Sequence, residues 1–172
     1  MKRILFLLLF IITLSLSGCK STPDVKEQIT LPMSFTACTK GSDSPYSVYV
    51  TRDYCDIEFI GKDLPSGARL HFEQGKSSST VGEFSFEIDE DSFPAMKALI
   101  NAIRALATSE ISGTATENGV KYTIDETDIL VYYDIETEVI TGIRTKELGR
   151  VFEFTLTDLK PYEAQSNGAG RP

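Results

Sequence analysis

The stretch FPAMKALINAIRALA, residues 93–107, decides the fold, because it carries a helical pattern inside a chain that otherwise alternates like strands. Its apolar residues recur at spacings of three and four, which places on one helix face Phe93, Met96, Leu99, Ile100, Ile103, Leu106 and Ala107. Ser92 is the expected N-cap, and Pro94 fits the first turn. We predict one amphipathic helix from about Phe93 to Thr108.

Outward from this helix, apolar and polar residues alternate with period two, which predicts strands on both sides of it. The expected strands before the helix lie at residues 33–37, 46–50, 55–59, 68–72 and 84–88, and those after it at 120–124, 128–133, 139–145 and 151–156. We expect residues 68–72 to pair with 84–88 as a hairpin, with a long mobile loop over Gln74–Thr80. The pattern therefore predicts a mostly β chain with one helix.

The amino-acid composition indicates which class of protein this is and argues against several kinds of site. The chain has 172 residues, 41% of them apolar, which is typical of one globular domain. Its net charge of −8 argues against a nucleic-acid partner. One histidine, three cysteines and no tryptophan leave few groups for metal or histidine chemistry. We expect no enzyme activity, no cofactor and no metal site.

The N-terminus resembles a lipoprotein signal. Lys2 and Arg3 precede the run Ile4–Leu16, which is apolar apart from two hydroxyl residues and is too short to span a bilayer comfortably. The four residues Leu16-Ser17-Gly18-Cys19 then resemble the lipobox of bacterial lipoproteins. That resemblance implies a diacylglycerol thioether on Cys19, cleavage before it and N-acylation. The alternative is an ordinary signal peptide that happens to end near a cysteine.

These features predict the domain organisation and the location of the protein. Residues 1–18 are the signal peptide, 19–29 the lipidated cysteine and a polar tether, 30–160 a single domain, and 161–172 a flexible tail. An acidic domain is repelled by anionic headgroups, so the acyl anchor must hold it on the membrane. We expect a cell-membrane protein, lipid-anchored on the extracytoplasmic face.

Two cysteines remain after lipidation, and they offer the clearest chemical question. Outside the cytoplasm, Cys38 and Cys55 can form a disulfide, which we favour slightly. The alternative is two free thiols, held far apart if Thr39 and Tyr46 close a tight hairpin. His71 lies on the polar side of its strand and is expected to be solvated. A zinc site made of Cys38, Cys55 and His71 would lack the short chelating pair, such as two cysteines three positions apart, that zinc sites use.

Several segments together resemble a known family. They are the lipobox, the segment Leu64–Phe72 (LPSGARLHF), Gly82–Phe86 (GEFSF), the Phe93-Pro94 helix start and the turn region Asp134–Gly142. Over roughly residues 30–160 the chain resembles small bacterial lipoproteins, common in Firmicutes, of the lipoprotein-carrier (LolA-like) half-barrel type. The resemblance implies an α+β, mostly β fold, in which a curved antiparallel sheet, an incomplete barrel, packs one helix on its concave face. In the carriers, an apolar cavity takes acyl chains.

Two functions follow as hypotheses. In the first, a non-enzymatic lipoprotein binds an apolar ligand, either a lipid or an acylated protein, in a groove beside the helix. The groove would be lined by some of the rings on the apolar parity of their strands, namely Phe35, Phe59, Phe72, Phe84, Phe86, Phe152 and Phe154. In the second, the helix fills the concave side, no ligand cavity is left, and the domain is an envelope protein-interaction module.

Overall fold

A computed structural model describes residues 25–60, 67–73 and 76–161 of the chain. The first half of this part contains the 3-10 helix η1 (Val25–Gln28) and the strands β1 (Met33–Thr39), β2 (Tyr46–Val50), β3 (Tyr54–Phe59), β4 (Arg69–Glu73), β5 (Lys76–Val81) and β6 (Phe84–Ile88). The second half contains η2 (Glu90–Ser92), the helix α2 (Pro94–Thr108) and the strands β7 (Thr114–Thr116), β8 (Gly119–Ile124), β9 (Thr127–Asp134), β10 (Val139–Glu147) and β11 (Arg150–Pro161).

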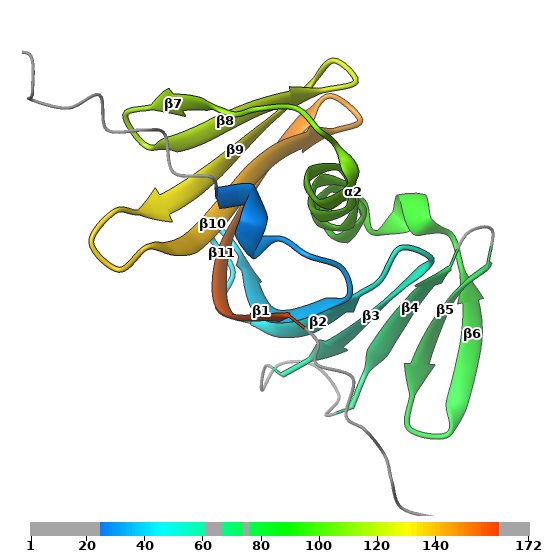
Figure 1. The fold of residues 1–172 in the computed structure, drawn as a ribbon. Helices are drawn as coiled ribbons and strands as arrows, with labels where there is room; N and C mark the ends of the chain where they lie inside the picture. The colour runs from blue at the N-terminus through cyan, green and yellow to red at the C-terminus, as the bar shows by residue number, and fades with distance from the viewer. Residues whose placement is uncertain (1–24, 61–66, 74–75, 162–172) are drawn as a thin grey trace, which may run out of the picture.

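All described strands join one open antiparallel sheet, in the order β6-β5-β4-β3-β2-β1-β11-β10-β9-β8-β7. Two meanders, β1–β6 and β7–β11, meet where β1 pairs with β11, from Met33 opposite Pro161 to Thr39 opposite Phe154. Figure 1 shows that the sheet is strongly curved and that α2 lies on its concave side. The predicted fold class, a curved half-barrel with one helix, is confirmed.

The apolar face of α2 forms the centre of the core. Leu99, Ile103 and Leu106 are fully buried, and the helix packs mainly against β10 and β11. Just before the helix, the ring of Phe93 meets that of Phe72 edge-on, with centroids 6.3 Å apart. These contacts bury the face that the spacing of three and four predicted, and they fix the helix across the concave side of the sheet.

Two strands were missed, β5 and the short strand β7, which pairs with β8. Residues 76–81 form β5, which pairs with β4 on one side and β6 on the other, so the expected loop over Gln74–Thr80 is wrong in this part. The expected hairpin between residues 68–72 and 84–88 is also wrong, because β5 separates the two segments. The serine-rich sequence of β5 has no apolar alternation, and only its two neighbours make it a strand.

Three boundaries also differ from expectation. Ser92 belongs to η2 and is not the N-cap of α2; the cap position is Phe93, which makes no side-chain capping hydrogen bond. Strand β11 continues to Pro161, beyond the expected end at residue 156, because β1 pairs along this extension. Val25 and Ile29, which we placed in the tether, are buried in the core, and η1 is the first described element.

Candidate functional site

The structure separates the seven aromatic rings expected to line a groove. Phe35, Phe72 and Phe154 are buried in the core, and Phe59 and Phe152 are partly buried against it. Phe84 and Phe86 are exposed, by 71% and 55% of their surface. The seven rings therefore do not form a single lining, and only these last two offer much of their surface to a ligand.

Phe84 and Phe86 lie on the concave face of the sheet. Phe86 of β6 lies opposite Ser79 of the neighbouring strand β5, and Ser79 lies opposite the buried Leu70 of β4. Directly opposed residues of antiparallel strands share a face, so Phe86 is on the same side as Leu70. Phe84, two residues away, shares that side. We call Phe84 and Phe86 the aromatic face; it lies on the edge strand β6, away from the strands against which α2 packs.

A cavity of about 540 Å³ opens beside α2, next to the turn between β2 and β3 and the end of β4. Its lining consists of Arg52, Asp53, Phe72, Glu73, Glu90, Lys97, Ile100, Asn101 and Arg104. We call it the α2 cavity. Of the expected rings, only Phe72 belongs to this lining. The space beside the helix is therefore charged, unlike the apolar groove that the sequence predicted.

Most polar side chains of the α2 cavity described below have a hydrogen-bond or ion-pair partner, but one atom has none. Lys97 forms an ion pair of 2.6 Å with Asp91, and this hydrogen bond raises the pKa of Lys97. Glu90 accepts a hydrogen bond of 2.6 Å from the buried Ser77 hydroxyl. Arg104 donates from Nε to the carbonyl oxygen of Thr51 at 3.0 Å. Its Nη2 atom is buried and has no partner among the residues that the structure describes.

The two described cysteines are free, so the favoured disulfide is wrong and the free-thiol alternative holds. Cys55 is buried on the concave face, opposite Phe72, whereas Cys38 follows the concave-face Ala37 and so points to the other side. Thr39 and Tyr46 close the β1–β2 hairpin with a 3.2 Å hydrogen bond between their hydroxyls. Strand β2 therefore lies between the strands that carry the two thiols.

His71 lies on the convex face, with Nδ1 2.7 Å from an oxygen of Asp56 and its ring beside that of Tyr54. Its side chain is partly exposed, as expected from the sequence. Residues 25–60, 67–73 and 76–161 contain no cluster of side chains suited to hold a metal ion. Over the same ranges, no helix has the length and apolar character needed to cross a membrane. Cys19 lies outside the described residues.

The fold defines a class, the open antiparallel half-barrel with a helix on its concave face. No family model and no curated protein matches the chain. Among solved structures, it is similar to an uncharacterized conserved protein from Thermus thermophilus, at 8% identity and a TM-score of 0.44, covering 80% of this chain and 83% of that chain. It is also similar to a LolA superfamily protein from Nitrosomonas europaea, at 10% identity and a TM-score of 0.36, covering 81% and 92%. At such scores neither likeness tells what this chain binds.

The charged lining of the α2 cavity was missed at the level of sequence. One signal was present, since Lys97, Asn101 and Arg104 recur at spacings of four and three and so form a polar stripe beside the apolar face of the helix. The partners across the cavity gave no signal. Asp53 and Glu73 lie in a turn and at a strand end, and only the sheet order brings them opposite this stripe.

Proposed function

We propose that this protein is a lipid-anchored, non-enzymatic binding protein that holds the acyl chain of a lipid or of an acylated protein on its aromatic face. The supporting observation is the exposure of Phe84 and Phe86, by 71% and 55%, on the concave side of the sheet. Neighbouring large side chains on that side are covered by the core. Exposed apolar surface of this kind marks a binding site or a risk of aggregation.

The position of α2 supports the same proposal. The helix packs mainly against β10, in the β7–β11 half of the sheet, while the aromatic face belongs to β6, the edge strand of the other half. Between Phe86 and Leu70, strand β5 presents the small side chain of Ser79. A small hydroxyl side chain beside the exposed ring of Phe86 leaves an apolar chain room to lie against that ring. The acyl anchor on Cys19 would keep this face near the membrane, on the extracytoplasmic side.

The aromatic face is tested with a matched pair of double variants. Phe84→Ser with Phe86→Ser removes both rings, and Ile135→Ser with Val151→Ser removes two apolar side chains of similar exposure, 68% and 56%, elsewhere on the surface. We expect the first variant to bind a fluorescent fatty acid at least about tenfold more weakly, because burial of each ring contributes about 1.5–3 kcal/mol. The control should bind like wild type.

A second function, the protein-interaction module, is favoured by a different observation. Strand β6 has no neighbour on its outer side among the described strands, and the backbone groups on that side can accept an extended peptide as a further strand. Fatty-acid binding that is equal in both double variants, or absent from wild type, would favour this function. Native mass spectrometry of the purified chain gives the direct measurement, since co-purified lipid appears as added mass.

A further inference from the structure

The guanidinium of Arg104 lines the α2 cavity and is only partly hydrogen-bonded within the described residues. Arg104 uses Nε to donate to Thr51, but its buried Nη2 atom meets no acceptor among the described residues. A buried donor loses its hydrogen bonds to water, so leaving it unpaired is costly, and for a charged group more so. Such a group in a native fold calls for an explanation, and the open space beside it offers one.

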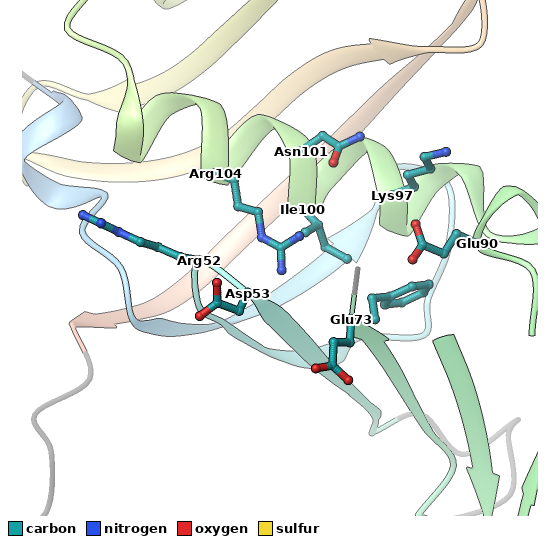
Figure 2. A pocket seen from close by; sticks show the side chains of 9 residues that line it. Arg52, Asp53, Glu73, Glu90, Lys97, Ile100, Asn101 and Arg104 are labelled. Atoms are coloured by element: carbon teal, nitrogen blue, oxygen red, sulfur yellow. The ribbon is translucent and has the colours of Figure 1, made fainter. Parts of the chain in front are cut away.

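The carboxylates of the same cavity do not supply the missing acceptor. Asp53, Glu73 and Glu90 all belong to the lining, yet none forms an ion pair with Arg104. The carboxylate of Asp53 has no partner of its own in the described part of the chain, and that of Glu73 has only the distant Nε2 of His71, at 3.9 Å. Figure 2 shows the guanidinium of Arg104 and the carboxylates of Asp53 and Glu90 around the same space, whereas the carboxylate of Glu73 points away from the helix.

The remaining cations are turned elsewhere. Lys97 is held by Asp91, and the side chain of Arg52 extends away from the other labelled residues. The cavity thus presents a guanidinium whose Nη2 atom lacks an acceptor, and the carboxylates of Asp53 and Glu90, which pair with no cation among the described residues. At about 540 Å³ it has the size of a small-molecule site rather than that of a single water. Phe72 and Ile100 add an apolar wall.

We propose that the α2 cavity binds a zwitterionic group. Its oxyanion accepts a hydrogen bond from the guanidinium of Arg104, and its ammonium group faces the carboxylates of Asp53 and Glu90. A purely anionic ligand would be repelled by the carboxylates of Asp53 and Glu90, and a purely cationic one would leave Nη2 of Arg104 without an acceptor. Two sources share this chemistry, a zwitterionic lipid headgroup and a free amino acid. The site is separate from the aromatic face and does not depend on acyl binding.

The proposal is tested by calorimetric titration of the full-length chain in an uncharged maltoside detergent. The soluble probes are glycerophosphoethanolamine and alanine as zwitterions, glycerol 3-phosphate as the anion alone and ethanolamine as the cation alone. Phosphatidylethanolamine and phosphatidylglycerol are added to the micelles in a second series. We expect at least one zwitterion to bind at least about tenfold more tightly than the anion or the cation alone, since charge-assisted hydrogen bonds are strong.

Two variants locate the site. Arg104→Gln should weaken binding of the zwitterion at least about tenfold, because it removes the charged donor. Arg150→Gln removes an exposed arginine outside the cavity and should bind like wild type. A readout on wild type needs no variant: the NMR resonance of the Arg104 Nε–H group should shift with the zwitterion and not with glycerol 3-phosphate.

The results distinguish the two sources of the zwitterionic group and can also overturn the proposal. Binding of alanine without a response to phosphatidylethanolamine assigns a free amino acid, and the reverse assigns a lipid headgroup. The proposal is overturned if glycerol 3-phosphate or ethanolamine binds as tightly as the zwitterions, if no zwitterion binds, or if a folded Arg104→Gln variant binds like wild type. None of these results depends on the aromatic face, so the outcome here and that of the fatty-acid experiment are independent.

Discussion

Burial controls the chemistry of the Cys55 thiol. It raises the pKa of this side chain from 9.0 to about 12, although the positive charge of Arg104 acts in the opposite direction. Because the thiolate is the reactive form, Cys55 is inert in the folded protein at neutral pH. A folded-state pKa above the unfolded value stabilises the fold fully below pH 9.0, and this contribution is lost as the pH rises toward about 12.

Thiol labelling at neutral pH checks this prediction. A maleimide should modify Cys38, whose Sγ lies near the surface with the Ser42 carbonyl at 3.0 Å, and should leave Cys55 unmodified until the chain is unfolded. Peptide mapping by mass spectrometry tells the two sites apart. A Cys38→Ser variant should lose the fast label. Equal labelling rates at both cysteines in the folded chain would contradict the buried position of Cys55.

At the scale of elements, the helix α2 holds the concave face together. Ile103 is fully buried on the side of the helix that faces the sheet. We expect Ile103→Ala to lower the free energy of unfolding by about 2–5 kcal/mol, because it leaves a cavity that the sheet cannot close. Asn101→Ala, on the exposed side of the same helix, should change it by less than about 0.5 kcal/mol. Denaturant unfolding measures both, and equal midpoints would disprove the packing of this face.

The elements differ in how far the sequence alone could predict them. The spacing of apolar residues gave the helix correctly, since Pro94–Thr108 is within one residue of the expected range. Burial of one face imposes that spacing, so it can be seen without the fold. Strand β5 was missed because Ser77, Ser78, Ser79 and Thr80 carry no such pattern. Its backbone pairs on both sides, and those hydrogen bonds depend on neighbours that local sequence does not identify.

The same limit applies to the candidate sites. Phe84 and Phe86 were found from their parity on a strand, but parity could not show that both remain exposed. Exposure depends on where α2 lies across the sheet. Arg104 belongs to a polar stripe that the sequence shows, whereas its missing acceptor is a property of the assembled cavity. Local pattern thus identifies faces of elements, and only the fold shows which faces remain uncovered.

At the scale of the whole molecule, one strand pair joins the two halves of the sheet. Residues near both ends of the described chain meet there, Met33 opposite Pro161, and the helix between β6 and β7 connects the two sheet edges. The result is an open half-barrel with the helix on its concave side (Figure 1). The described part of the chain begins at Val25, so residues 20–24 separate it from the expected anchor at Cys19. At about 3.6 Å per residue, this length allows a reach of roughly 20 Å.

The anchor gives the last prediction, which concerns the whole protein in its membrane. The thiol of Cys19 is the only atom of the lipobox that can carry the diacylglycerol, so Cys19→Ala should block processing. The variant should keep residues 1–18, show the higher mass of the precursor and lack the mass of the acyl chains in mass spectrometry. Cys38→Ala, which changes a cysteine of the folded part, should mature and partition into detergent like wild type. A Cys19→Ala chain that matures and partitions in the same way would contradict the proposed lipid anchor.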